Sequence, residues 1–527
     1  MSFISDLLLQ HPVVFVLALG AFLYFAKCKF DEHNSLPLPP GPKPLPVIGN
    51  LLDAPTGTEV HRDFREWSFK YDSDILFLRL PSLPMLIINS STIAFDLLEK
   101  RSNIYSDRPT STIDDMLGMD FNVGSMLYST KWREHRKLFH RFFNSTAIPQ
   151  YVPEQIRAVR SFLRRTLQNP CSDYAQSVRL LFASSILKIV YGVDVDDMNH
   201  EYIRLSQGVL DCENEAHTPG KFLIDFFPIL RHLPGWFPGV KFKAFVEQHR
   251  PTVMGMRFKP FEDIKKAAAD GTASPSIALT LLGELQNSPK DMFGAGRFSE
   301  QEETAINVTG VTYIAGIDTT TSSAITFFLT MAAHPDIQRK AQAYIDAHLG
   351  VSRLPDSTDL EALPYLRAIA LEVIRIRPVA PMGIPHRVTE DDEYLGYRIP
   401  KGTMIMVNVW STLRDPHEYP EPERFNPDRF LKDGKLDSNV RDPSTLVFGF
   451  GRRMCPGRHF SDMSMFLMIA SVLQVYDIEP AKDKDGRPID LNTVKYSSGI
   501  VATPESLPVV FIPRSSAAQQ LILESDI

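Results

Sequence analysis

Cys455 stands in a bend rich in glycine and arginine, Phe448-Gly449-Phe450-Gly451-Arg452-Arg453-Met454-Cys455-Pro456-Gly457. Cysteine binds metal as the thiolate, which needs nearby positive charge and backbone amides that donate hydrogen bonds to sulfur. Arg452 and Arg453 can supply the charge, and the glycines at 451 and 457 let the backbone lie close to a flat cofactor. The segment therefore predicts a thiolate ligand for iron. A buried free cysteine in a glycine-rich loop is the alternative.

A second group, Ala315-Gly316-Ile317-Asp318-Thr319-Thr320, lies inside a predicted helix although Gly and Thr are poor helix formers. The Thr319 hydroxyl can donate to the Ala315 carbonyl four residues earlier and open the helix beside Gly316. We expect a notch that holds a diatomic ligand next to a metal, with Asp318 and Thr319 placed to deliver protons. The alternative is a buried polar kink in a core helix.

Glu372 and Arg375 are three residues apart on a helix that ends before Pro378. Such a pair is common on helix surfaces. Its apolar flanks, however, indicate a buried helix, where charges need further partners. Arg429, in the proline-bounded loop 425–430, can complete a Glu–Arg–Arg network because its planar guanidinium binds two acceptors at once.

The elements that position these residues are mostly helices. Apolar residues recur at helical spacing, whereas strand-like runs are fewer and shorter. We therefore predict a mainly α fold with a minor β lobe and no linker after residue 50. The clearest predicted helices span 304–333, 360–376 and 460–473, and the clearest strands span 75–80, 85–88 and 404–409.

The N-terminus predicts a membrane anchor. Residues 7–26 are long and apolar enough for one transmembrane helix, and Lys27 and Lys29 follow it, which favours a cytosolic body. A cleaved signal peptide is the alternative. The proline-rich run 36–46 predicts a semi-rigid spacer, with a disordered linker as the alternative. The expected organisation is an anchor over 1–30, a hinge over 31–50 and a catalytic domain over 51–527.

Composition excludes several classes of protein. The four cysteines, at 28, 171, 212 and 455, show no paired spacing, which argues against a disulfide scaffold and a structural zinc site. The net charge of -7 argues against a general nucleic-acid binder. The hydrophobic content of 44% is that of an ordinary globular protein with a large core.

Together, FxxGxRxCxG at 448–457, AGxDTT at 315–320, ExxR at 372–375 and FxPxRF at 425–430 resemble, in type and order, the motifs of the cytochrome P450 monooxygenases. The resemblance covers essentially the whole chain and implies the P450 fold. It implies haem b as cofactor, with Cys455 as its proximal ligand and Asp318 and Thr319 as an acid–alcohol pair. It also implies propionate contacts from Trp132, Arg136, His386 and Arg453, and a structural triad of Glu372, Arg375 and Arg429.

The implied activity is insertion of one oxygen atom from O2 into a lipophilic small molecule, by hydroxylation or epoxidation, as in fungal microsomal enzymes of secondary metabolism. Rearrangement, dehydration or phenol coupling without net oxygen insertion is the second hypothesis, and a non-catalytic haem sensor is the third. No dinucleotide fingerprint is present, so electrons are expected from NADPH-cytochrome P450 reductase, with cytochrome b5 as a further candidate donor. The expected location is the endoplasmic reticulum membrane.

Two surfaces could serve these partners. A basic helix near the predicted proximal side could dock the reductase, although an ordinary solvated helix face is equally compatible with it. The apolar segment 222–237 could rest on the membrane, with a buried connection as the alternative. The basic residues are Lys131, Arg133, Arg136, Lys137 and Arg141.

Overall fold

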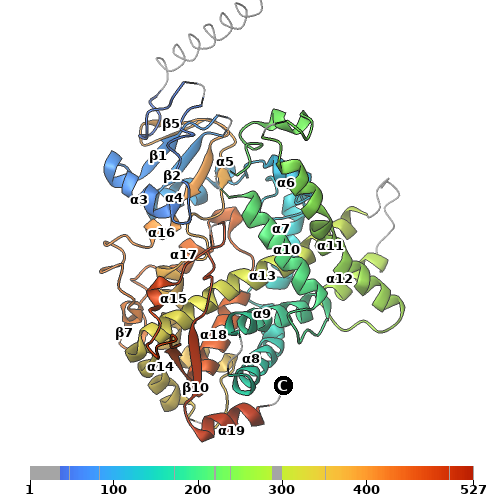
Figure 1. Cartoon of the computed structure of the whole chain (residues 1–527), viewed down its shortest axis with the longest axis vertical. Helices are drawn as coiled ribbons and strands as arrows, with labels where there is room; N and C mark the ends of the chain where they lie inside the picture. The colour runs from blue at the N-terminus through green and yellow to red at the C-terminus, as the bar shows by residue number, and fades with distance from the viewer. Residues whose placement is uncertain are drawn as a thin grey trace, which may run out of the picture.

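Helix α13 (Glu300–Ala333) runs through the middle of the molecule, and the other long helices pack around it (Figure 1). The computed structural model describes residues 36–525 except 47, 82, 171–172, 219–220, 238, 288–298, 351 and 498. The side chain of Ser299 caps α13 by accepting a 3.2 Å hydrogen bond from the Glu302 N–H. Most residues of α13 are buried on every side, as expected for a helix inside a large domain.

Two hydrophobic cores meet along α13. Its first half, up to Ile317, packs with α7 (Thr130–Phe143), α10 (Glu201–Ala216) and α11 (Phe242–Ala269). From Ala324 onwards it packs with α8 (Val152–Gln168), α15 (Pro364–Ile376) and α18 (Arg458–Val475). Helix α9 (Tyr174–Tyr191) contributes to both cores. The polar motif at 315–320 therefore lies where the two cores join.

A four-stranded sheet forms the minor lobe at one end of the molecule, in the order β1-β2-β6-β3. Strand β1 (Ile75–Leu78) pairs antiparallel with β2 (Met85–Ile88), and β2 pairs parallel with β6 (Met404–Val407). Strand β3 (His386–Arg387) pairs antiparallel with β6. Because β2 and β6 are far apart in sequence, this sheet brings the N-terminal region against the chain that follows α15.

The remaining elements are short helices and two-stranded sheets around this framework. The helices are α3 (Val60–Tyr71), α4 (Ser91–Phe95), α5 (Ser102–Tyr105), α6 (Thr112–Leu117), α12 (Ile277–Asn287), α14 (Pro335–His348), α16 (Val409–Thr412), α17 (Ser444–Val447) and α19 (Ser516–Glu524). The strands are β4 (Asp392–Tyr394), β5 (Tyr397–Ile399), β7 (Leu431–Lys432), β8 (Lys435–Leu436), β9 (Tyr476–Pro480) and β10 (Val509–Pro513).

The predicted fold class, mainly α with a minor β lobe, is confirmed, and the predicted helices and strands are present with shifted ends. The starts of two helices differ most: α13 begins at Glu300 rather than at 304, and the helix predicted over 360–376 begins later than predicted. Helix α15 begins only at Pro364, and residues 357–362 form a separate 3₁₀ turn. Proline fits the first turn of a helix, where its missing N–H would have no helical partner, so the helix starts there.

The predicted membrane helix, residues 7–26, lies outside the described residues. Within the part of the chain that the structure describes, no helix combines the length and apolarity of a membrane span. The described part of the proline-rich run is attached to the minor lobe. The Pro37 carbonyl accepts a 2.9 Å hydrogen bond from the Arg398 N–H, and the Pro40 carbonyl accepts one of 2.8 Å from the Phe77 N–H.

Candidate active site around Cys455 and α13

The Cys455 loop is shaped by two glycines in the left-handed region. Gly449 has φ +79° and Gly451 has φ +49°. A Cβ on Gly451 would lie 2.5 Å from the Leu98 carbonyl oxygen, so a side chain is excluded there. Gly457, by contrast, has an ordinary φ of -86° and directly precedes α18. Close backbone approach was predicted at Gly451 and Gly457, whereas the positive φ values that favour glycine occur at Gly449 and Gly451.

The surroundings of the Cys455 thiol suit the binding of a metal cation. Its own N–H donates a 2.7 Å hydrogen bond to the Phe448 carbonyl, which closes the loop. Burial raises the pKa of the thiol, while the Gly457 N–H and the charge of Arg136 act in the opposite direction. Arg136, from α7, donates to the Met454 carbonyl beside it. A bound metal ion deprotonates such a thiol outright, so this loop suits a metal-ligating thiolate.

Arg453 and Trp132, both predicted to contact a propionate, lie against each other. The guanidinium carbon is 4.3 Å from the centroid of the Trp132 ring, a cation–π contact. The Arg453 side chain is buried, and burial lowers its pKa to about 10. Among the residues that the structure describes, it donates to backbone carbonyls alone, at 2.7 Å to Ser106, 3.4 Å to Val123 and 2.8 Å to Met126.

Arg108, which the sequence analysis did not single out, belongs to the same cluster. It is 4% exposed, and burial together with the charge of Arg453 holds its pKa well below the usual range. Its partners are again carbonyls, those of Gly124, Ile384 and Pro385 at 2.8, 2.9 and 2.5 Å. An arginine in the short sequence Asp107-Arg108-Pro109 was the only available signal, and it does not indicate burial.

His386 lies beside this group of buried arginines, as an imidazole that its surroundings keep neutral. Its Nδ1 lies 2.9 Å from the Tyr105 carbonyl oxygen, and burial and the charge of Arg108 hold its pKa well below the usual range. The neighbouring carboxylate, Asp107, is engaged by Arg387 at 2.5 Å. Among the described residues, neither Arg108 nor Arg453 forms an ion pair with a carboxylate. This surplus of buried positive charge fits the two propionates of haem.

Ala315 and Thr319 are accessible in an otherwise largely buried, unbroken part of α13, and this accessible site is called the opening of α13 below. The Thr319 hydroxyl donates a 2.7 Å hydrogen bond to the Ala315 carbonyl, as the sequence predicted. Ala315 is exposed and Thr319 half-buried, although the residues around them are buried. Gly316 serves another purpose, because its Cβ would lie only 3.3 Å from Ile186 of α9. The small residue thus lets two helices approach, and the opening lies beside it.

Asp318 binds Arg179, a partner that was not predicted from the sequence. Its carboxylate forms an ion pair with Arg179 of α9, with a second nitrogen–oxygen contact of 3.1 Å. Burial raises the pKa of Asp318 to about 6, although the charge of Arg179 opposes this. A carboxyl group with this pKa can hold or release a proton near neutral pH. The only sequence signal for Arg179 was a single arginine within an apolar helix.

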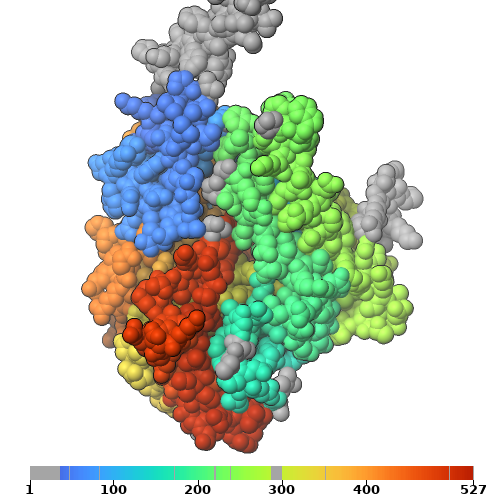
Figure 2. All heavy atoms as spheres, viewed as in Figure 1, coloured from blue at the N-terminus to red at the C-terminus, as the bar shows by residue number. Residues whose placement is uncertain are grey.

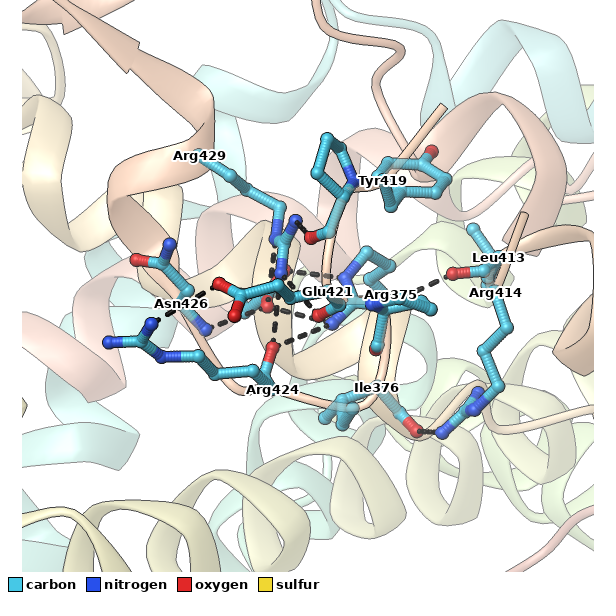
Figure 3. A network of polar contacts seen from close by, with 12 residues as sticks. Arg375, Ile376, Leu413, Arg414, Tyr419, Glu421, Arg424, Asn426 and Arg429 are labelled. Carbon is cyan, nitrogen blue, oxygen red and sulfur yellow. Dashed lines mark hydrogen bonds and ion pairs between the residues drawn. The ribbon is translucent and has the colours of Figure 1, made fainter. Parts of the chain in front are cut away.

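Glu372, Arg375 and Arg429 form the predicted network. Arg375 binds both carboxylate oxygens of Glu372, at 2.6 and 2.8 Å, and both side chains are fully buried. Arg429 donates to the same carboxylate at 3.1 Å, and so does the Asn426 N–H at 2.8 Å. Figure 3 shows Arg375 and Arg429 converging on the irregular chain around Arg424. An exposed helix-surface pair is therefore excluded for Glu372 and Arg375.

Comparison with known proteins gives one consistent result. The family model described as cytochrome P450 matches residues 39–509. A cytochrome P450 monooxygenase of Coprinopsis cinerea, COX2, is 39% identical over 487 residues, which cover 92% of this chain and 90% of that protein. The monooxygenase ple1 of Rhodocybe pseudopiperita is 37% identical, with 96% and 94% covered. A tryptamine 4-monooxygenase of Psilocybe cyanescens is 36% identical, with 95% and 97% covered.

Proposed function

This chain belongs to the cytochrome P450 family of monooxygenases, and from that premise we propose that it inserts one atom of dioxygen into a lipophilic small molecule. Hydroxylation and epoxidation are the proposed reactions, in a pathway of secondary metabolism. One observation carries the proposal: the chain has both the Cys455 loop, with buried arginines nearby, and the opening of α13 at Thr319. Each would be needed for oxygen insertion, because one binds the metal and the other supplies protons.

Haem b would be held by this chain's own donor set. Cys455 would ligate the iron, and the propionates would be neutralised by Arg136, Arg453 and the newly found Arg108. His386 would contact them as a neutral hydrogen-bonding group, and Trp132 packs against Arg453. When bound, haem supplies the chemistry that activates dioxygen. Carbonyl groups orient the buried guanidiniums, so their positions are fixed before any anion binds. Preorganised cations of this kind bind carboxylates with little loss of side-chain entropy.

The proposed proton supply uses two side chains on α13. The Thr319 hydroxyl donates its proton to a hydrogen bond with the Ala315 carbonyl, and it can turn to donate to a group bound at the opening. Asp318, the preceding residue, is held by Arg179 of α9. With a pKa of about 6, Asp318 can take up a proton and pass it on at neutral pH. Residues 372, 375 and 429 act only on folding in this scheme.

The electron donor is proposed to dock beside the Cys455 loop. Of the five basic residues predicted for this role, Lys131 and Arg141 are engaged by Glu303 and Glu284, and Arg136 faces the Cys455 loop. Arg133 and Lys137 remain exposed on α7. Arg452 adds a third exposed cation, and both arginines lie over the ring of Tyr128. This patch suits an acidic surface of NADPH-cytochrome P450 reductase or cytochrome b5.

Attachment to the endoplasmic reticulum membrane is proposed through residues 7–26 and a second contact. In the segment 223–237, Trp236 is 82% exposed and Ile229 is 69% exposed. Such large apolar side chains are costly in water and suit a lipid interface. Figure 2 shows the blue N-terminal segments and the green segments that follow residue 200 side by side at one end of the molecule. Both contacts could therefore meet one membrane surface.

The decisive test is turnover of the haem-loaded enzyme with reductase, NADPH and ¹⁸O-labelled dioxygen against a panel of lipophilic metabolites. Label in the product is the expected result. Turnover without label would instead indicate rearrangement, dehydration or phenol coupling. Gas binding with no turnover of any compound would indicate a sensor and contradict the proposed function.

A further inference from the structure

A closed circuit of hydrogen bonds joins the first half of α7 to α13 and α11. Nδ1 of His135, on α7, lies 2.8 Å from the Lys131 carbonyl oxygen, and Nε2 lies 3.1 Å from the side-chain nitrogen of Asn307 on α13. The Asn307 side-chain oxygen accepts a 3.0 Å hydrogen bond from Arg257 of α11. Arg257 and Lys131 both bind Oε1 of Glu303, at 2.9 and 3.1 Å. These five residues are called the His135 network below.

The partners of His135 determine which of its nitrogens carries the proton. A carbonyl oxygen only accepts hydrogen bonds, so Nδ1 carries the proton and donates to Lys131. Arg257 only donates, so it binds the Asn307 oxygen, and the amide nitrogen of Asn307 donates to Nε2. The imidazole is therefore neutral, which agrees with the burial that lowers its pKa. Position 135 thus needs a side chain that donates on one side and accepts on the other.

The central side chains of the network are completely enclosed. His135 and Asn307 are 0% exposed, and Arg257 is 6% exposed. A buried donor or acceptor that loses its partner is costly, so the side chains of such a network keep one arrangement. The ion pair of Lys131 with Glu303, by contrast, is partly exposed. The network therefore fixes α7 relative to α13 mainly through His135 and Asn307.

His135 lies between two residues of the proposed haem site. Trp132, about one turn earlier, packs against Arg453. Arg136, the next residue, donates to the Met454 carbonyl in the Cys455 loop. The second half of α7 is held by buried phenylalanines in the hydrophobic core. The first half, which carries Trp132 and Arg136, is joined to α13 by the His135 network.

We infer that His135 and Asn307 are positioning residues, which hold α7 so that Trp132 and Arg136 face the haem propionates. The inference rests on the proposed haem site and adds the residues that keep two of its side chains in place. Both nitrogens of His135 are engaged within the protein, so His135 acts through α7 and not on the cofactor. Because its ring is neutral, the contribution is geometric. A guanidinium that is held in place before an anion binds loses little side-chain entropy on binding.

The test is the rate at which the haem-loaded full chain releases haem to excess apomyoglobin. His135→Leu can neither donate nor accept, so it should release haem about tenfold faster than the wild type. Asn307→Ala removes the donor to Nε2 and should act in the same direction. His135→Gln keeps one donor and one acceptor and should stay within about threefold of the wild-type rate. Release at the wild-type rate from both His135→Leu and Asn307→Ala would overturn the inference.

Resonance Raman spectra give a second readout, which a general loss of stability would not change. The bending modes of the propionates report their hydrogen bonds. These bands should shift in His135→Leu and Asn307→Ala and should keep their wild-type positions in His135→Gln. Unshifted bands in both of the first two variants would overturn the inference.

Gln338→Leu is the matched control. Gln338 is also buried, and it donates to the carbonyls of Met331 and Ile478 in the other hydrophobic core. Its loss should lower thermal stability without changing haem release or the propionate bands. Effects equal to those of His135→Leu would show that any buried polar contact acts in this way, and would overturn the inference.

His135→Gln decides the matter if His135→Leu and Asn307→Ala both fail to load haem. Normal loading with unshifted propionate bands would support the inference, and failure to load would overturn it. All of these measurements are made without turnover, so a negative result leaves the labelled-oxygen test of the proposed function intact. A wild-type chain that binds no haem would instead contradict the proposed function itself.

Discussion

Arg179 of α9 and Asp318 of α13 form a buried ion pair one residue before Thr319. The pair connects the helix that crosses the middle of the molecule to a neighbour that contributes to both hydrophobic cores. Because burial and Arg179 act in opposite directions on Asp318, the protonation state of this carboxyl group depends on whether the pair is closed.

Loss of Arg179 should change the pH dependence of the reaction. In Arg179→Gln, the pKa of Asp318 should rise from about 6 by roughly one unit, because an opposing positive charge is removed. The inflection of product formed per NADPH should move to higher pH by the same amount. Lys188→Gln, a change on the same helix as Arg179 that removes a pair with the exposed Asp194, is the control. An unchanged inflection would show that Asp318 does not take part in proton supply.

Loss of the Thr319 hydroxyl should uncouple NADPH consumption from product formation. In Thr319→Ala the haem should still be reduced, but the ordered proton donor is absent, so peroxide should rise as product falls. Product and peroxide per NADPH are the measurements. Thr330→Ala removes the same type of helix hydrogen bond elsewhere on α13 and should leave coupling unchanged. Unaltered coupling in Thr319→Ala would show that Thr319 shapes the helix and does not supply protons.

Substitution of Cys455 should abolish the spectrum of a thiolate-bound haem. The reduced, carbon-monoxide-bound wild type should show the red-shifted Soret band of thiolate ligation, and Cys455→His should lose it. Cys212→Ala removes another buried free cysteine and should keep the band. A normal band in Cys455→His would disprove the assignment of the ligand.

Breaking the Glu372–Arg375 pair should lower the yield of folded protein and should not act on the catalytic step itself. Either residue changed to Ala leaves its partner charged and fully buried, at a cost of about 3–5 kcal/mol. We expect little soluble, haem-loaded protein, measured by yield and thermal unfolding. Arg367→Ala changes another residue of α15, breaks only an exposed pair with Glu361, and should be tolerated. Wild-type stability of Glu372→Ala would contradict this account.

Removal of residues 1–30 should leave a folded enzyme with residual membrane affinity. The described cores lie entirely downstream of this segment, and Trp236 and Phe237 remain exposed as an apolar contact. Flotation with microsomal lipids should recover part of the truncated protein, and Trp236→Ser with Phe237→Ser should abolish this. Complete solubility of the truncated parent would eliminate the second contact. Protease protection of the full-length body inside sealed microsomes would overturn the cytosolic orientation.

Sequence patterns predicted what depends on local chemistry and missed what depends on distant partners. The Thr319–Ala315 hydrogen bond and the buried Glu372 network follow from spacing within a helix or from a strong need for charge compensation. Arg108 and Arg179 could not be found in this way. Their importance comes from burial and from partners on other elements, and a single arginine in an apolar stretch does not reveal either.

The region that precedes the Cys455 loop is held by its main chain. Arg375 donates to the carbonyls of Leu413, Pro422 and Arg424, and Arg429 donates to those of Pro420, Glu421 and Arg424. Every residue type carries a backbone carbonyl, so these hydrogen bonds do not depend on which side chain the accepting residue has. The exposed positions between 416 and 424 can therefore vary during evolution, or accept engineered surface residues, without losing their path, provided that both arginines and the buried Leu413, Arg414 and Tyr419 remain.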